Sequence, residues 1–195
     1  MSEEPAANPL QTALAAVARA ARGKGLEEFL VIGGHAVIVY GVPRFTRDID
    51  FLIPSDLSLR WRDLLEPLGY RFGHGTAAFE QFFPSNESAL PRIDLMLVDR
   101  STWGKLSAAA ETHPFSEGLS LRVPAAKHMI ALKLNAATSP TRQRASQDWD
   151  DVSELIRRCN LDIHEPELEA LILRYGGEGA WSRLSNPIRP PSSPE

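Results

Sequence analysis

The fold is decided by residues 32–53, which read IGGHAVIVYGVPRFTRDIDFLI. An apolar, partly β-branched run that leads into this stretch, residues 28–32, predicts a strand that ends at the diglycine Gly33-Gly34. The next apolar run, residues 35–40, is followed by a glycine and a proline and predicts a short helix. The stretch thus predicts a strand, a glycine turn and a helix ahead of a polar segment.

That polar segment predicts a strand with two carboxylates on one face. Residues 46–53 alternate, so that Asp48 and Asp50 leave the same side with Cα atoms about 6.6 Å apart. Such a pair on an apolar strand costs free energy unless a cation or donor compensates it, and Mg²⁺ prefers oxygen ligands of this kind. Asp94, in the apolar run 92–98, adds a third carboxylate. Three such groups can hold two Mg²⁺ ions about 4 Å apart, which is the chemistry of phosphoryl and nucleotidyl transfer.

A plainer interpretation exists for the acidic pair. Asp48 and Asp50 could line the solvent side of an edge strand and pair with Arg44 or Arg92, and an isolated Asp-x-Asp tripeptide favours that reading. The upstream diglycine favours the site, because bare backbone N–H groups at a strand end suit the phosphates of a nucleotide.

Outside this stretch, strands and helices alternate and only helices follow. That order predicts an α/β (α+β) core with a C-terminal helical cap. Further helices are expected at residues 10–22, 57–68, 125–137, 147–159 and 166–175, and further strands at residues 81–83, 92–98 and 119–123.

Length and composition indicate a globular protein in a reducing compartment. The chain has 195 residues, which at about 150 per domain suggests one domain with a small addition. Its net charge of -4 excludes a global positive field, so that any nucleic-acid contact needs a local basic patch. A single cysteine, Cys159, excludes a disulfide framework and a cysteine-cluster zinc site. The chain shows no signal peptide, and its most apolar run is too short to cross a membrane, so we expect no membrane partner and a cytoplasmic location. We expect a flexible N-terminus at 1–8, a core at 9–123, helices packed on it at 124–185 and a flexible Pro/Ser-rich tail at 186–195.

The last third carries a second set of candidate residues. Lys133 lies on the apolar stripe of its helix, where its ammonium could bind phosphate or simply reach into water from a packed stem. Asp148 and Asp151 lie near the start of the next helix, where the helix dipole alone favours acidic residues. Arg142 and Arg144 form a small basic cluster that could bind phosphate or solvate a loop.

The spacing of these motifs resembles the nucleotidyltransferase superfamily, which has the polymerase-β-like fold. The diglycine, thirteen residues, Asp48-Ile49-Asp50 and a later Asp94 match its signature, and the stretch 32–53 looks like the AbiEii/AbiGii toxin-like branch. The resemblance implies a small mixed β-sheet flanked by helices. It implies metal ligation by Asp48, Asp50 and Asp94, catalytic roles for these acids and for Lys133, Asp148 and Asp151, and nucleotide binding by Gly33, Gly34, Arg44, Thr46, Lys133, Arg142 and Arg144.

The function implied by this resemblance is transfer of an NMP from an NTP, ATP among them, to a hydroxyl group. The cofactor would be two Mg²⁺ ions, with Mn²⁺ as an alternative, and the acceptor an RNA or tRNA end, a protein or a small molecule. The protein could be the toxin of a toxin–antitoxin or phage-defence system with a cognate antitoxin. Gly34 and Gln147 replace a serine and a basic residue that are common in relatives, which keeps open an inactive nucleotide- or partner-binding module. An antitoxin-type minimal nucleotidyltransferase that modifies a partner protein is a further alternative.

Overall fold

A computed structural model describes residues 8–85, 90–116, 118–139 and 144–186. Most of the two ends that we expected to be flexible, residues 1–7 and 187–195, lies outside this part of the chain. The chain forms two compact units. The first contains residues 1–39 and 43–125, and the second contains residues 40–42 and 126–195.

The first unit is built on a five-stranded sheet with the strand order β1-β2-β5-β4-β3. β2 and β5 run parallel, whereas the other neighbouring pairs are antiparallel, which confirms the predicted mixed sheet. The strands are β1 (Leu30–Val31), β2 (Ile49–Pro54), β3 (Tyr70–Gly75), β4 (Phe79–Pro84) and β5 (Ile93–Val98).

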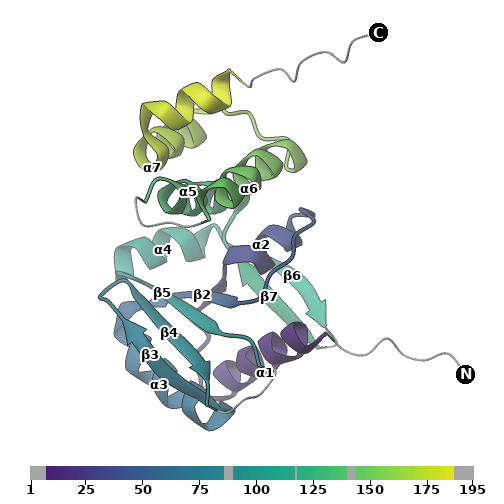
Figure 1. The fold of residues 1–195 in the computed structure, drawn as a ribbon, viewed down its shortest axis with the longest axis vertical. Coiled ribbons are helices and arrows are strands. Elements are labelled where there is room, and N and C mark those ends of the chain that lie inside the picture. The colour runs from purple at the N-terminus through teal and green to yellow at the C-terminus, as the bar shows by residue number, and fades with distance from the viewer. Residues whose placement is uncertain (1–7, 86–89, 117, 140–143, 187–195) are drawn as a thin grey trace, which may run out of the picture. The chain divides into compact units, whose positions relative to one another are not determined.

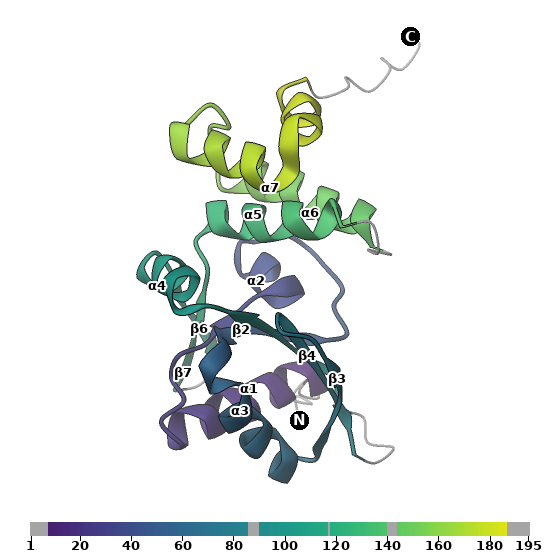
Figure 2. The same ribbon diagram turned by 90° about the vertical axis from the view of Figure 1, so that its left-hand side faces the viewer.

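Helices lie on both faces of this sheet (Figures 1 and 2). α1 and α3 lie on one side, and α2 lies on the other, against β2. Two 3-10 turns, Ser55–Leu57 and Glu66–Leu68, flank α3, and a separate hairpin of β6 and β7 completes the unit. The bounds are α1 (Pro9–Gly23), α2 (Gly33–Val39), α3 (Ser58–Leu65), α4 (Arg100–Ala108), β6 (Glu111–Ser116) and β7 (Leu119–Val123).

An aromatic cluster fixes which face of β2 is buried under α3. The ring of Phe51 lies 5.6 Å from that of Phe29 and 5.2 Å from that of Trp61, and all three side chains are buried. Because side chains alternate along a strand, burying Phe51 here turns Asp50 toward the opposite face, where α2 lies. The apolar pattern of the strand thus places its acidic side.

Three elements of the first unit were missing from the prediction. β3 is mostly exposed and contains two glycines, so it lacks the alternation that marks a half-buried strand. α4 buries only Trp103 and Leu106, and β6 contains Pro114, which is atypical of a strand. The strand expected from residue 46 begins at Ile49 instead, because Thr46 Oγ1 donates locally to the Asp48 carbonyl at 3.2 Å.

The second unit consists of α5 (Ala126–Ala137), α6 (Ala145–Arg158) and α7 (Pro166–Ser185). α5 packs against both α6 and α7. The prediction that α7 ends at Tyr175 was wrong, because the chain resumes a helical path beyond Gly177, whose φ of 71° makes a kink. Of the helices in the ranges that the structure describes, none has the length and hydropathy needed to cross a bilayer.

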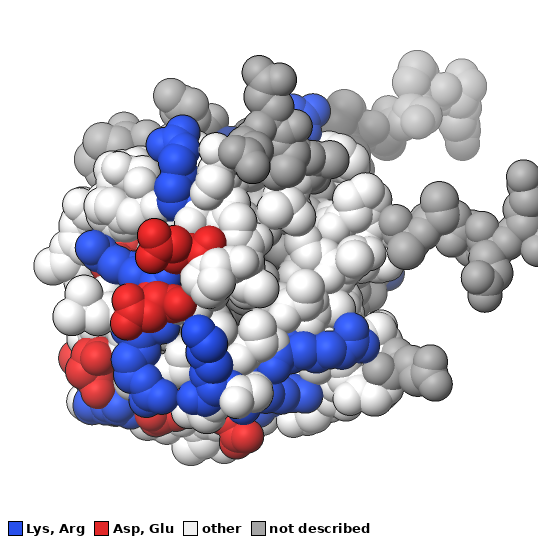
Figure 3. All heavy atoms as spheres, turned by 90° about the horizontal axis from the view of Figure 1, so that it is seen from below, with Lys and Arg blue, Asp and Glu red and all other residues white. Residues whose placement is uncertain are grey.

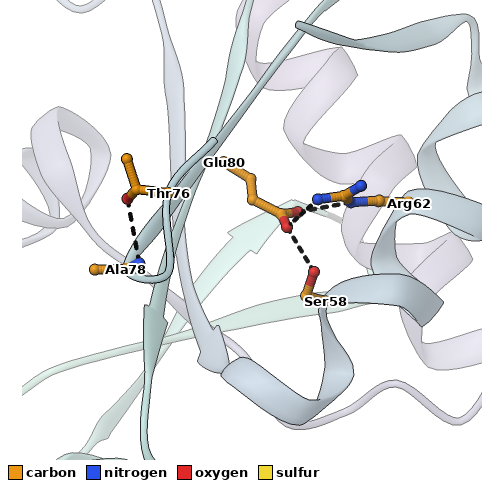
Figure 4. Close-up of polar contacts among 5 residues, drawn as sticks. All are labelled: Ser58, Arg62, Thr76, Ala78 and Glu80. Atoms are coloured by element: carbon orange, nitrogen blue, oxygen red, sulfur yellow. Dashed lines mark hydrogen bonds and ion pairs between the residues drawn. The ribbon is translucent and has the colours of Figure 1, made fainter. Parts of the chain in front are cut away.

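A buried carboxylate ties β4 to α3 (Figure 4). Glu80 is 3% exposed; its Oε1 accepts hydrogen bonds from Ser58 Oγ and Arg62 Nη2, each at 2.6 Å. The Arg62 guanidinium also lies 4.0 Å from the centre of the Phe72 ring, on the adjacent strand β3. Glu80 therefore connects a strand, a helix and the stacked arginine.

We expect Glu80→Gln to lower the free energy of unfolding by about 1–2 kcal/mol, because a neutral amide weakens the charge-assisted bonds while Arg62, 38% exposed, keeps its water. Urea unfolding measures this loss. Glu80 accepts three hydrogen bonds in all, because Arg62 Nε also donates to its Oε2 at 3.3 Å. Ser58→Ala removes one of them and is the milder control. Equal stability of Glu80→Gln and the wild type would contradict the role of Glu80.

Candidate active site

A row of polar residues crosses the sheet of the first unit. Asp50 of β2 is the direct register partner of Asp94 of β5, Asp94 pairs with Gln81 of β4, and Gln81 pairs with His74 of β3. Directly paired residues project to the same face of a sheet, and neighbouring strands lie about 4.8 Å apart. The two acids that the sequence singled out on separate strands therefore lie side by side.

Arg92 joins the third acid to this pair. Its Nη2 donates to Asp48 Oδ2 at 2.6 Å, and its Nε lies 3.2 Å from Asp94 Oδ1. The pairing with Arg92 that we considered in the plainer interpretation is thus present. That interpretation also placed the acids on an edge strand, which is not what the structure has, because β2 lies between β1 and β5.

The carboxylate of Asp94 is held through one of its oxygens. Oδ1 accepts a hydrogen bond from Gln81 Nε2 at 3.0 Å and faces Arg92 Nε. Burial raises the pKa of Asp94, the contacts with Gln81 and Arg92 lower it, and the nearby charge of Asp48 raises it again. The balance is a pKa above the ordinary value for Asp, which makes this carboxylate a stronger proton acceptor than a free one.

The diglycine is packed directly against the acids. Gly33 has a φ of +63°, and a Cβ on it would lie 2.0 Å from Asp50 Oδ2. A Cβ on Gly34 would lie 2.7 Å from both Cβ and Oγ1 of Thr46, and 3.3 Å from Arg44 Nε. Only glycine fits at Gly33, on grounds of both backbone conformation and space. The Thr46 hydroxyl occupies the place that a side chain at Gly34 would take.

The donor set fits a hard divalent cation in its chemistry. All three candidate ligands are carboxylates: Asp50 and Asp94 are register partners on adjacent strands, Asp48 lies just ahead of β2, and the absence of a side chain at Gly33 accommodates the carboxylate of Asp50. Within the described ranges, no group of three His, Cys, Asp or Glu side chains is positioned to hold a metal ion as it stands. The guanidinium of Arg92 lies between two of the three carboxylates.

A cavity of about 620 Å³ lies in the first unit beside Arg44 and Thr46. Its wall includes His35 of α2, which is 6% exposed and whose Nδ1 makes no hydrogen bond with the described residues. Burial lowers the pKa of His35 from 6.5 to about 4, so that its ring is neutral near pH 7.

His35 makes the first unit sensitive to acid. Because its pKa is lower in the folded chain than in the unfolded one, its contribution to stability is complete above about pH 6.5 and is lost as the pH falls toward 4. Between pH 7.5 and 4.5 we expect this group alone to cost about 2–3 kcal/mol. Urea unfolding at both pH values should show a smaller loss for His35→Leu than for the wild type and for the exposed control His74→Gln. Equal losses in all three would contradict this assignment.

The remaining candidates gather in the second unit. Lys133 Nζ lies 3.0 Å from Asp148 Oδ1 and 2.8 Å from Asp151 Oδ2, and the three side chains are 7%, 1% and 5% exposed. The structure thus joins α5 to α6 through one buried lysine and two buried carboxylates. Arg144 lies at the N-cap position of α6, and Arg142 lies outside the described residues.

Sequence reasoning missed two residues of the site in the first unit. Gln81 was seen only as part of a short strand, and Arg92 only as the partner in the plainer interpretation. No local signal marks either one, because their importance comes from the register between β4, β5 and β2.

The first unit also carries basic residues on its surface. Arg22 and Lys24 lie at the end of α1, and Arg60 lies on α3. Arg60 donates to the Lys24 carbonyl and Lys24 to the Asp63 carbonyl, so these hydrogen bonds leave the charges of the two cations in place. Figure 3, the view from below, shows Lys and Arg side chains on this face with Asp and Glu side chains among them.

The chain resembles a known family in sequence and solved structures in fold. The profile of a family described as "Nucleotidyl transferase AbiEii toxin, Type IV TA system" matches residues 15–191. The fold is similar to that of ANT(2'')-Ia in complex with adenylyl-2''-tobramycin, with a TM-score of 0.62, 15% identity, and 89% of this chain and 97% of that chain covered. It is also similar to the lincosamide antibiotic adenylyltransferase LnuA (0.52, 13%, 74% and 94%) and to the Megavirus polyadenylate synthase (0.53, 16%, 80% and 32%). No curated protein matches the sequence significantly.

Proposed function

Because the chain belongs to the AbiEii nucleotidyl transferase toxin family, we propose that it transfers an NMP from an NTP to a hydroxyl group of an acceptor. The observation that carries this proposal is the register of Asp50 with Asp94, with Asp48 linked to Asp94 through Arg92 and the diglycine packed on Asp50. Three carboxylates that lie close together raise the free energy of the folded chain unless a cation compensates their charge.

We propose that Asp48, Asp50 and Asp94 hold divalent metal, with Mg²⁺ as the first candidate and Mn²⁺ as the alternative. When bound, the metal supplies charge that activates the attacking oxygen and stabilises the leaving pyrophosphate. Asp94 orients the acceptor, and the amide of Gln81 holds its carboxylate through Oδ1. The acceptor oxygen bonds to the α-phosphorus, the bond from that phosphorus to the β-phosphate oxygen breaks, and Asp94 takes up the hydroxyl proton.

Binding of the triphosphate is assigned to the other side of Asp50. Gly33 and Gly34 bring bare backbone close to the carboxylate, and Arg44 and Thr46 lie next to Gly34. The charge of Arg44 and the hydroxyl of Thr46 suit phosphate oxygens. We also propose Arg142, Arg144 and Lys133 for further phosphate contacts.

We propose the acceptor and the biological role on the basis of membership in this family. Arg22, Lys24 and Arg60 lie on the side of the sheet that carries α1 and α3, opposite the acids, so RNA or tRNA, a protein and a small molecule all stay candidate acceptors. We further propose that the protein is the toxin of a toxin–antitoxin pair, whose cognate antitoxin limits this activity. A chain that binds nucleotide and transfers none would instead be an inactive binding module.

Incubation of the purified protein with each labelled NTP, Mg²⁺ and either total tRNA or a cell protein extract tests the proposal. We expect label on one acceptor class, released pyrophosphate, and loss of both when the metal is chelated. Absence of label under every condition, together with absence of binding to Mg²⁺ and NTP, would refute the enzyme assignment.

A further inference from the structure

We propose that Arg92 is the internal counter-ion of the three-carboxylate site and that a divalent metal has to displace its guanidinium. The inference rests on the proposed function, because it concerns the same acids. It assigns to Arg92 a positioning role: the arginine holds the site in a neutralised state until metal and nucleotide arrive together.

The backbone fixes where this arginine lies. Ile49 N donates to the Arg92 carbonyl at 2.9 Å, and Ile49 pairs with Ile93, so Arg92 is held beside Asp48 just ahead of the two parallel strands. Arg92 also lies two residues before Asp94 and therefore shares its face of the sheet. The guanidinium is thus directed between Asp48 and Asp94 by strand register.

The contacts of Arg92 with the two carboxylates are short and partly shielded from water. The guanidinium reaches Asp48 Oδ2 at 2.6 Å and Asp94 Oδ1 at 3.2 Å, and the two carboxylates are only 18% and 12% exposed. Ion pairs on the surface contribute little free energy because water and salt screen them, and partial burial weakens this screening. A divalent cation and the guanidinium would draw on the same carboxylate charge, so the binding of one opposes the binding of the other.

Displacement leaves Arg92, 33% exposed, without carboxylate partners. The triphosphate of an NTP offers oxygens that a guanidinium binds with a planar, two-pronged geometry. Metal that binds alone must therefore replace the contacts of Arg92 with the carboxylates, and their free energy is lost in full. When nucleotide binds with the metal, the displaced arginine gains a new partner. The arrangement predicts weak binding of the free metal and cooperative binding of metal and NTP.

Titration with Mn²⁺, followed by electron paramagnetic resonance, tests this without any turnover. We expect Arg92→Met to bind Mn²⁺ about tenfold more tightly than the wild type when nucleotide is absent. Gln81→Leu is the matched control, because Gln81 contacts the same oxygen of Asp94 but carries no charge, and it should not tighten binding. Addition of the non-hydrolysable α,β-methylene analogue of each NTP should increase the Mn²⁺ affinity of the wild type more than that of Arg92→Met.

The outcomes separate this inference from the proposed function. The inference is overturned if Arg92→Met binds Mn²⁺ no more tightly than the wild type, or if Gln81→Leu tightens Mn²⁺ binding equally. Either result would count even if the wild type transfers nucleotide. Tighter Mn²⁺ binding in Arg92→Met supports it even if no NTP is ever transferred. Arg92→Gln replaces the methionine variant if thermal unfolding shows that the latter does not fold.

Discussion

Asp50→Asn is expected to reduce nucleotidyl transfer by about 10³-fold or more, because it removes one negative charge from the centre of the site while keeping the shape of the side chain. Asp50 lies between two other parts of the site. It is the register partner of Asp94 on the neighbouring strand, and its Oδ2 lies against Gly33. A neutral amide cannot replace a carboxylate as a ligand of a hard cation. The rate should be measured at saturating NTP and Mg²⁺, as release of labelled pyrophosphate.

The matched control is Asp63→Asn, the same chemical change on an exposed residue of α3. It should leave the rate unchanged. Asp50→Asn should unfold at the temperature of the wild type or above it, because removing a like charge from the acidic cluster relieves repulsion. Asp63→Asn should unfold at the temperature of the wild type, because Asp63 is exposed. An Asp50→Asn enzyme that retains a tenth or more of the wild-type rate would contradict the assignment of Asp50 to the metal.

The acidic side of the sheet could be predicted because local rules determine it. Phe51 and its apolar neighbours must face the core, and the alternation of a strand then directs Asp50 the other way. The diglycine could likewise be predicted to lie at a turn. The structure adds the reason why Gly33 has to be glycine: the carboxylate of Asp50 fills the space of its Cβ.

The rest of the site depends on strand register and could not be predicted. A sequence does not state which residue of β4 or β5 lies opposite which residue of β2, and the roles of Gln81 and Arg92 follow from that pairing alone. Elements with little buried surface, β3 and α4, escaped for a related reason, since periodicity is visible only where a face is buried. The kink at Gly177 ended the predicted helix too early, because a glycine that stops a helix and one that bends it look alike in sequence.

Lys133→Met is expected to destabilise the second unit by about 3–5 kcal/mol, because it leaves two buried carboxylates, Asp148 and Asp151, without their cation. Methionine fills nearly the same volume, so the loss reports charge and not packing. Hydrogen exchange of the α5 and α6 amides measures the effect locally. Lys127→Met on the same helix is the control: its ion pair with Glu167 is exposed and should contribute less than about 1 kcal/mol.

The same series separates a structural lysine from a catalytic one. The triple variant Lys133→Met, Asp148→Asn, Asp151→Asn removes the unpaired charges together, and we expect it to recover much of the stability lost in the single variant. If Lys133 only joins α5 to α6, nucleotidyl transfer should return with stability. If Lys133 also binds phosphate, as the family resemblance implies, the triple variant should be folded and still inactive. A fully stable Lys133→Met protein would contradict the structural role, because its two buried carboxylates would then need another source of compensation.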